Sequence, residues 1–499
     1  MNWLGTGCVL LAFSLSLAGQ EAPPGPAVPP PSPEVRAEDL RRHVEFLASD
    51  RLQGRSTGSP EAMEAARYLA LELQRYGVEP AGEEGTYFQK VPIGRTEFLE
   101  IPKLAWWDAA GVRLEGRAGV DFDLVDGGSE ARELSVVYVA AAAEIPAPAD
   151  PALALVLLAE SAAERVAWLK AAGIPDGGGF GLVVHLGAKD AGNRPMERPP
   201  RPRAKIAGPT PRISARGDLR KALAERRVTR FSFSAPVRTE VREAANVVGR
   251  LRGGGSKERA DLAQEIIELS AHYDHLPPRQ GAEGEDVIFN GADDDASGCA
   301  VVLELAENLA HGPRPARTLL FFFATGEEIG LVGTNYSLEH PLVPLDQIVL
   351  DVNFEMLGRP DTLLSAPARM WLTGYERSDL GDELARLGLP VVADPRPEQQ
   401  FFQRSDNYAL ALRGVVAQTL SSYGMHTDYH TVRDEAATLD WVHMEACARG
   451  ALSGVRAIAD GSFRPRWREG LDPSKPRARS GGAKPPSEPP PEKPKPAGG

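Results

Sequence analysis

Cysteine is nearly absent from this chain, which has three in 499 residues. Cys8 lies in an apolar N-terminal segment, so Cys299 and Cys447 can supply at most one disulfide. A small secreted scaffold held together by disulfides is therefore excluded. Whether Cys299 and Cys447 pair stays open. With 42% hydrophobic residues, the chain is long enough to bury the cores of two or three packed domains.

Positive charge is also scarce. The chain has 56 Lys and Arg against 69 Asp and Glu, which gives a formal net charge of −13. Proteins that bind nucleic acid usually carry a basic patch, and no such patch occurs in the segments expected to fold. We therefore expect no nucleic-acid partner.

Long apolar runs are missing apart from a short one at residues 4–17, which ends at Ala18-Gly19-Gln20. Its length and its small closing residues predict a secretory signal over residues 1–20, although no Lys or Arg precedes it. A buried strand or a membrane anchor would be the alternative, but the run is short for a span and leads into prolines. We expect an exported protein, periplasmic or secreted, with no stable membrane span after signal removal.

Proline-rich stretches bound the part of the chain that is expected to fold. Residues 21–35 predict a linker, because prolines remove the hydrogen-bond donors that helices and sheets need. Residues 463–499 combine proline with Lys, Arg and Gly and predict a disordered tail.

Between these ends we expect a main domain interrupted by an insert. Residues 36–96 form its first part, with a helix that starts at Ser59-Pro60 and ends before Gly77. Residues 97–240 have a different sequence pattern, with short runs typical of β-strands around a helical segment at 162–172. This pattern predicts a smaller inserted domain. Residues 241–462 complete the main domain.

Strands and helices alternate from residue 246 onward. Apolar runs at 266–269, 319–323 and 348–350 predict buried strands, and the apolar spacing at 301–309 is helical. Continuous apolar strands that alternate with amphipathic helices indicate a sheet covered on both faces. The fold class is therefore α/β, a three-layer α/β/α sandwich with a mixed, mostly parallel central sheet.

Potential metal ligands follow each of these strands. His272 and Asp274 come after the first, and residues two apart on a strand share a face. Asp274 could then accept the second N–H of His272 and leave the other ring nitrogen free for a metal. Alone, this motif would equally suit a solvated strand end.

Three aspartates, at residues 293–295, precede the helical segment. Capping and the helix dipole, worth about 0.3–1 kcal/mol for each charge, explain one or two of them. A third, crowded by its neighbours, is easier to justify beside a cation. The spacing does not say which of the three would be the ligand.

Acids also close the next two strands. Glu327 and Glu328 follow the phenylalanine run, where repulsion and desolvation impose a cost that a divalent metal would offset. One of them can bind while the other stays free as a general base. Glu355 follows the third strand, at the edge where open α/β sheets place their ligands.

The last motif holds His426 and His430, four residues apart in a loop-like stretch. Either, both or neither could bind a metal, and the spacing does not decide. Two histidines with three carboxylates exceed what one zinc needs, so the whole set indicates a two-metal hydrolase site.

These motifs, in this order, resemble the M28 family of zinc metallopeptidases, which includes bacterial aminopeptidases. The matching stretches are AHYDH at 271–275, GADDDASG at 291–298, ATGEEIGLVG at 324–333, VNFEMLGR at 352–359 and DYHT at 428–431. Segments at 46–78, 243–251 and 404–411 are also similar to the family. Residues 211–215, with Asp218-Leu219, resemble a protease-associated insert.

The resemblance implies a role for each residue. Asp274 would orient a ligand histidine, Glu327 would be the general base, and Asp294 would bridge two zinc ions, with Co²⁺ or Mn²⁺ as possible substitutes. His275 and His426 would support the site without binding metal. The implied ligands are His272, Asp294, Glu328, Glu355 and His430.

The implied reaction is removal of N-terminal residues from peptides, through a water shared by the two metals and deprotonated by Glu327. A carboxypeptidase or dipeptidase of the same superfamily would need a basic residue for the substrate carboxylate, such as Arg359, Arg396 or Arg404. A glutaminyl cyclase usually works with one zinc. A non-catalytic binding protein on the same fold is the alternative that is not an enzyme.

Overall fold

We describe a computed structural model of the chain. It covers residues 30–159, 161–174, 178–187, 195–196, 210–279, 281–364, 368–423 and 425–475. The signal expected at residues 1–20 lies outside the described residues. Most of the tail expected after residue 463 does so too.

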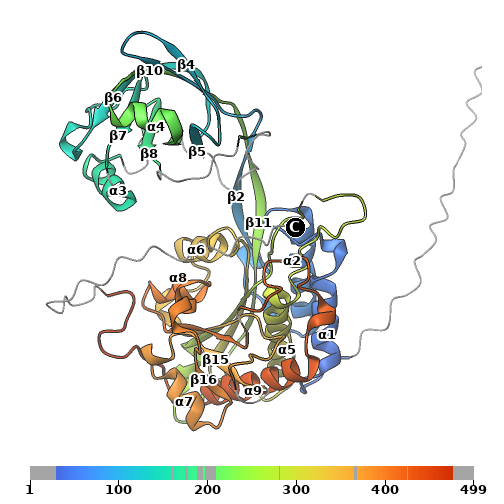
Figure 1. Ribbon diagram of the computed structural model, residues 1–499. Helices are drawn as coiled ribbons and strands as arrows, with labels where there is room; N and C mark the ends of the chain where they lie inside the picture. Colours follow the sequence, from blue (N-terminus) through green and yellow to red (C-terminus); the bar gives the residue numbers. More distant parts are fainter. Residues whose placement is uncertain are drawn as a thin grey trace, which may run out of the picture.

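A nine-stranded sheet forms the larger part of the molecule (Figure 1). Its central pairings are parallel, β12 with β13 and β14, and β14 with β17, whereas the outer strands include antiparallel pairs. In spatial order the strands are β1 (Glu79–Pro80), β11 (Val237–Leu251), β13 (Thr318–Ala324), β12 (Ile266–His272), β14 (Ile348–Phe354), β17 (Ala417–Ser421), β15 (Met370–Leu372) and β16 (Val391–Ala393), and β2 (Phe88–Phe98) also pairs with β11. The sheet is mixed, as expected, and β15 and β16 at one edge are also parallel.

Both faces of this sheet are covered, and β13 shows why. Leu319, Phe321 and Phe323 pack into one core, and the alternating Leu320 and Phe322 pack into another. A strand buried on both faces must be apolar at every position. Helices α1 (Ala37–Leu47), α2 (Pro60–Arg75), α5 (Gly298–His311), α7 (Leu380–Arg386) and α9 (Trp441–Asp460) contribute to the first core. Helices α6 (Val332–Glu339) and α8 (Asn407–Ala411) contribute to the second.

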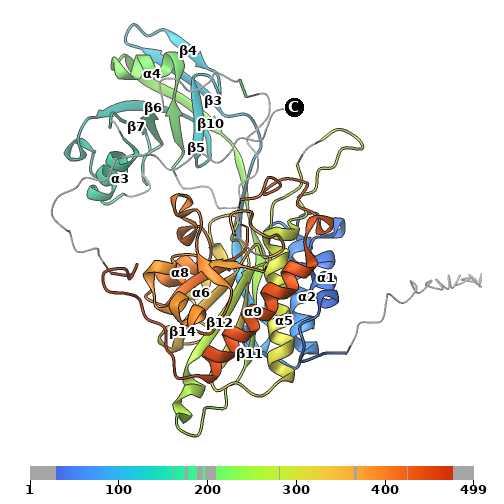
Figure 2. The same cartoon turned by 60° about the horizontal axis from the view of Figure 1, so that its bottom comes forward.

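The expected three-layer α/β/α sandwich is therefore the observed fold. Figure 2 shows α1, α2, α5 and α9 together on one side of the sheet. The helix expected after Ser59 is α2, and the Ser59 side chain accepts a hydrogen bond from the Ala62 N–H. Gly77 follows it with φ +76°, a conformation that glycine adopts without strain.

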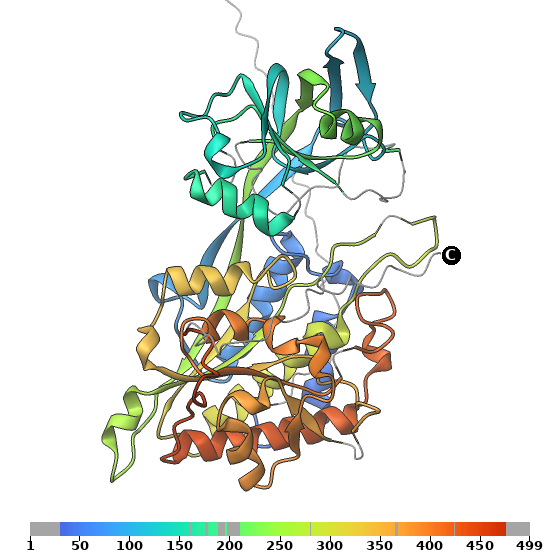
Figure 3. The ribbon, with the colours of Figure 1, turned by 60° about the vertical axis from the view of Figure 1, so that its left-hand side comes forward.

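A second, eight-stranded sheet has its own core, built around Phe122, Phe231 and Phe233 (Figure 3). In spatial order its strands are β4 (Arg113–Gly116), β3 (Lys103–Asp108), β10 (Val228–Ala235), β6 (Ser129–Val139), β7 (Leu153–Leu157), β8 (Leu182–Leu186), β9 (Arg212–Ala215) and β5 (Phe122–Asp126). Helices α3 (Ala162–Ala171) and α4 (Gly217–Ala224) accompany it.

A two-stranded ribbon joins the two sheets (Figure 1). Strands β2 and β11 pair from Phe98 opposite Val237 to Phe88 opposite Val247 without interruption. The boundaries expected at residues 97 and 240 therefore fall inside continuous strands, because β2 and β11 extend from the large sheet towards the small one.

The ends of the main domain differ from the sequence-based boundaries. Val35, expected in a flexible linker, is buried, and the backbone N–H of Ser32 donates to Glu307. Residues 463–475, expected to be disordered, lie against the domain, where Trp467 forms a bridge with Ser378. The Trp467 ring also packs against Phe402. Proline-rich composition concealed these few apolar anchors, whose burial stabilises an otherwise polar segment.

Cys299 and Cys447 are both buried and free, so they do not pair. The sulfur of Cys299 lies 3.1 Å from the carbonyl oxygen of His272 instead. No helix in the described part of the chain is long and apolar enough to cross a membrane.

Candidate metal centre

The parallel strands β12, β13 and β14 end at the same edge of the sheet, and the site lies there. His272 is the last residue of β12, and Glu327 and Glu355 follow the ends of β13 and β14. This is the edge where open α/β sheets bind ligands. Two groups of possible metal ligands form there: His272, Asp294 and Glu355, and His275, Asp294, Glu328 and His430.

Asp294 is the member common to both groups. Its Oδ1 lies 3.3 Å from His272 Nε2, and its Oδ2 lies 3.0 Å from His430 Nε2. The two oxygens of one carboxylate thus face different histidines. The five ligands expected from the sequence are all brought together, and His275 joins them.

The other two aspartates of the triplet hold the loop in place. Asp295 accepts hydrogen bonds from the backbone N–H groups of Gly298 and Met356. Asp293 accepts one from the Gly358 N–H and faces His426 Nε2 at 3.2 Å. His426 therefore lies behind the site and belongs to neither ligand group.

Asp274 lies beside both His272 and Glu327. The Nδ1 of His272 lies 3.2 Å from the backbone oxygen of Asp274 and 4.0 Å from its carboxylate. The Asp274 carboxylate also accepts from the Thr57 hydroxyl at 2.6 Å and from the Glu327 N–H at 3.1 Å. That Asp274 orients His272 stays a prediction, and the contact with the Glu327 backbone is one that the motif did not indicate.

Glu327 lies beside both ligand groups without being a member of either. It lines the same cavity as Asp294, Glu328, Glu355 and His430, with a volume of about 330 Å³. Burial raises the pKa of Glu327 well above its usual range, and the charges of Glu355 and Glu328 act in the same direction. The Glu327 carboxyl therefore holds a proton more readily than a solvent-exposed glutamate does.

Histidines and carboxylates at this site shift one another's pKa values strongly. Burial alone would lower the pKa of His430, but its hydrogen bonds to Asp294 and Glu328 raise it to about 10. Burial and the charge of Asp294 would raise the pKa of Glu328, but His275 and His430 hold it at about 2. Carboxylates that draw neighbouring histidines into the charged form are typical of a place where a cation belongs.

Buried polar atoms without a well-formed hydrogen bond also indicate a place for a cation. The Nε2 of His272 and the Nδ1 of His275 are buried and make no hydrogen bond of good geometry among the described residues, although carboxylate oxygens lie 3.3 Å and 2.9 Å away. Buried polar atoms are rarely left in this state, because each costs about 1–3 kcal/mol. Mixed nitrogen and oxygen donors at this spacing suit zinc or a similar divalent metal, so the residues present fit the implied cofactor.

Arg55 is a supporting residue that no motif identified. Its buried guanidinium donates to the backbone oxygens of Tyr273, Leu47, Asn290, Gly291 and Asp294. These carbonyls belong to the segments that carry the ligands. Only its place in the stretch at 46–78 that is similar to the family could have pointed to it.

Replacing Arg55 with methionine is expected to lower the free energy of unfolding by about 3 kcal/mol or more, because several buried carbonyls would lose their donor. Urea denaturation followed by circular dichroism measures this. The matched control is Arg51→Met, whose side chain is 70% exposed and which is expected to change the unfolding free energy by less than about 0.5 kcal/mol. Equal effects of the two substitutions would contradict this role for Arg55.

The cavity beside the ligands has an aromatic wall. Trp371 and Phe401 line it, with ring centroids 5.1 Å apart. Tyr429 stacks on the ring of His430 at 3.9 Å. Arg404 is the one Lys or Arg among the described residues that line this cavity.

A cluster of histidines and carboxylates at the carboxyl edge of an α/β sheet, with a further acid beside it, is an arrangement that metal-dependent hydrolases use. Residues 246–455 match the family described as "Peptidase family M28". The match agrees with the resemblance inferred from the motifs and covers the segment that carries them.

Named proteins agree with this assignment. The chain is 32% identical over 195 residues to "Probable lipoprotein aminopeptidase LpqL" of Mycobacterium tuberculosis, which covers 38% of this chain and 32% of that protein. It is 24% identical over 196 residues to "Vacuolar membrane protease" of Saccharomyces cerevisiae, covering 38% of this chain and 18% of that protein. The chain thus spans a third or less of the length of these relatives.

The fold is shared with the solved structure "Aminopeptidase from Aneurinibacillus sp. strain AM-1". The TM-score is 0.54 at 18% identity, and the match covers 86% of this chain and 96% of the other. This similarity supports the α/β fold class.

Proposed function

We propose that this protein is an exported exopeptidase with two zinc ions, an aminopeptidase that removes N-terminal residues from peptides. One observation carries the proposal. Glu327 lines the same cavity as the ligand groups and belongs to neither, while the Asp294 oxygens face both. A site of this kind holds its metals and still has an acid free for proton transfer.

His272, Asp294 and Glu355 would hold one ion, and Asp294, Glu328 and His430 the other. When bound, such ions supply Lewis acidity, which polarises a peptide carbonyl and lowers the pKa of water. Glu327 accepts the proton of the attacking water at its carboxylate and returns it to the nitrogen of the leaving amine. Asp274 keeps Glu327 in position through the backbone N–H.

The scarcity of basic residues in the cavity favours an aminopeptidase, because a carboxypeptidase needs a cation to bind the terminal carboxylate of its substrate, and Arg404 is the one Lys or Arg among the described residues of the lining. Of the three arginines considered for that role, Arg359 is paired with Asp428 and Asp434, and Arg396 with Asp361. Arg404 alone stays available and is considered below.

A cyclase and a non-catalytic binding protein are less well supported. A glutaminyl cyclase usually needs one zinc, and this chain presents two ligand groups that share Asp294. A non-catalytic relative would be expected to have lost ligands, and every ligand implied by the sequence is present. Export rests on the apolar run at residues 4–17, together with the small residues that follow it.

A substrate panel with metal counting tests the proposal. The purified chain would be offered aminoacyl anilides, N-acetylated peptides and peptides with N-terminal glutamine, and bound zinc would be measured by atomic absorption. An aminopeptidase cleaves the anilides, spares the N-acetylated peptides and holds about two zinc ions. Cleavage of N-acetylated peptides from the carboxyl end would overturn the aminopeptidase assignment, and cyclisation of glutamine would identify a cyclase.

A further inference from the structure

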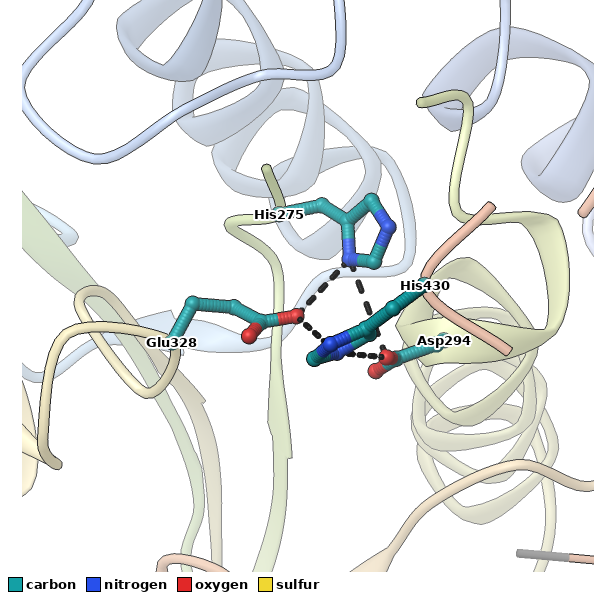
Figure 4. A group of neighbouring side chains, drawn as sticks. All are labelled: His275, Asp294, Glu328 and His430. Carbon is teal, nitrogen blue, oxygen red and sulfur yellow. Dashed lines mark hydrogen bonds and ion pairs between the residues drawn. The ribbon is translucent and has the colours of Figure 1, made fainter. Parts of the chain in front are cut away.

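His275 is the one member of the two ligand groups that the sequence motifs did not assign to a metal. Its side chain is fully buried and its Nδ1 lies 2.9 Å from Glu328 Oε1 and 3.8 Å from Asp294 Oδ2. His430 Nε2 lies 3.1 Å and 3.0 Å from the same two oxygens. Figure 4 shows the two imidazoles and the two carboxylates pointing toward one another.

These distances fit a single metal ion. Zinc binds nitrogen and oxygen at about 2.0–2.1 Å, so neighbouring ligand atoms at the corners of a tetrahedron lie about 3.3 Å apart. The four contacts of this group range from 2.9 to 3.8 Å and scatter around that value. All four atoms lie within 4.8 Å of one another, close enough to share one ion.

The His275 ring is also held in place without a hydrogen bond. Its Nδ1 has no partner of acceptable geometry among the described residues, although Glu328 is near. The ring packs on Gly291, where an added Cβ would lie 2.6 Å from the ring carbons. A glycine at this position leaves room for the imidazole.

We infer that His275 is a fourth protein ligand of the metal held by Asp294, Glu328 and His430. This ion then has a complete tetrahedral set, whereas the ion held by His272, Asp294 and Glu355 has three ligands and room for others. The two sites are unequal, and the four-ligand site binds its metal more tightly.

Cobalt substitution tests the inference without measuring activity. Each imidazole bound to Co²⁺ through one nitrogen places its other N–H close to a paramagnetic ion, which shifts that proton far outside the normal NMR range. The wild-type protein with two Co²⁺ is expected to show three shifted exchangeable imidazole protons, from His272, His275 and His430. His275→Ala is expected to show two.

The matched control is His426→Ala, which removes a nearby buried histidine outside both groups and is expected to keep three shifted protons. The number in the wild-type protein decides the question even if His275→Ala does not fold. Two shifted protons in the wild type would overturn the inference. In a chelator competition, His275→Ala is also expected to release one of two metals at least about 100-fold more readily, beyond the usual effect of losing a supporting residue.

A second inference concerns Arg404, and it rests on the proposed function. Its exposed guanidinium lies over the Phe401 ring at 5.1 Å, at the edge of the cavity. In the part of the chain that the structure describes, it makes no ion pair with a carboxylate, whereas Arg359 and Arg396 each do. A lone cation in a cavity lined by Glu327, Glu328 and Glu355 is suited to an anionic part of the substrate.

We propose that Arg404 binds a carboxylate of the peptide substrate. That carboxylate belongs either to the side chain of an N-terminal Asp or Glu, or to the C-terminus of a short peptide. Arg404 thereby selects acidic N-terminal residues or very short peptides from among those with a free amine.

Two substrate pairs separate these sources. Glutamyl and leucyl anilides differ in the side chain, and leucyl-glycine and its C-terminal amide differ in the terminal carboxylate. Arg404→Ala is expected to lower kcat/KM by about 10-fold to 100-fold for the anionic member of one pair, mainly through KM, because a hydrogen bond to a charged group contributes about 1.5–3 kcal/mol. Arg404→Lys is expected to restore part of the loss.

For the neutral member of each pair, Arg404→Ala is expected to change kcat/KM by less than about threefold. The control variant is Arg413→Ala, which replaces an exposed arginine outside the cavity. It is expected to change kcat/KM by less than about threefold for all four substrates. Equal losses for all four substrates, or no loss for any, would overturn the role of Arg404. Failure of the wild-type protein to cleave leucyl anilide would instead refute the aminopeptidase itself, so the two outcomes are distinguishable.

Discussion

Replacing Glu327 with glutamine is expected to lower kcat by about 10²-fold to 10⁴-fold, the usual contribution of a positioned general base. The amide has nearly the same shape but cannot accept the proton of the attacking water. Because Glu327 belongs to neither ligand group, the variant should keep its full metal content. Steady-state kinetics on the best anilide, with atomic absorption on the same preparation, measures both quantities. Glu327→Ala is expected to behave in the same way.

Glu328→Gln is the matched control for this prediction. Glu328 is the next residue along the chain, but it belongs to the four-residue group. Its amide variant is therefore expected to lose activity together with metal, and added zinc should restore part of it. If Glu327→Gln retained most of its turnover in a zinc-replete preparation, another group would have to be the base.

Asp294→Asn is expected to have the largest effect on metal binding. Both groups of ligands include Asp294, and its two oxygens face His272 and His430 separately. The neutral amide removes the charge shared by the two ions and replaces one oxygen donor with an N–H₂ group, which cannot bind metal. We expect the metal content to fall from about two ions per chain to one or none. Activity should fall by at least about 10³-fold, because Lewis-acid stabilisation contributes several kcal/mol.

Asp351→Asn serves as the control. Asp351 is also a fully buried aspartate, on β14 just before Glu355, and its carboxylate accepts from the Ser270 hydroxyl. It belongs to neither ligand group, so its variant should keep both metals. Isothermal titration with zinc, on protein first stripped by a chelator, compares the two variants. Two tight sites in Asp294→Asn would contradict the shared role.

The predicted helices and strands were confirmed where the prediction depended only on neighbouring residues in the sequence. The cap at Ser59, the glycine after the helix and the apolar run of β13 each depend on neighbouring residues, and all three are in the structure. The placement of the acids at strand ends followed from the same pattern. Parallel strands then bring those ends to one edge, so the site could be expected before any distance was known.

Two residues have contacts that the sequence did not indicate, because these contacts are not local. Asp274 was expected to orient His272, and its carboxylate lies 4.0 Å from His272 Nδ1 but also accepts from the Glu327 N–H. His275 was expected to have a supporting role because five ligands already completed the implied set. Its position beside Glu328 and His430 depends on residues more than 50 positions away in the sequence.

By itself, the sequence determined the α/β class, the peptidase family and the residue types that gather at the sheet edge. Those follow from hydrophobic periodicity and from short motifs, both of which act over a few neighbouring residues. Only the tertiary structure showed that the two oxygens of Asp294 face different histidines, that His275 and His430 lie against the same Glu328 oxygen and that Arg404 has no carboxylate partner among the described residues. The reason is physical: ligand geometry and ion pairing depend on distances of about 3 Å between segments that are far apart in the chain, and only the packed core sets these distances.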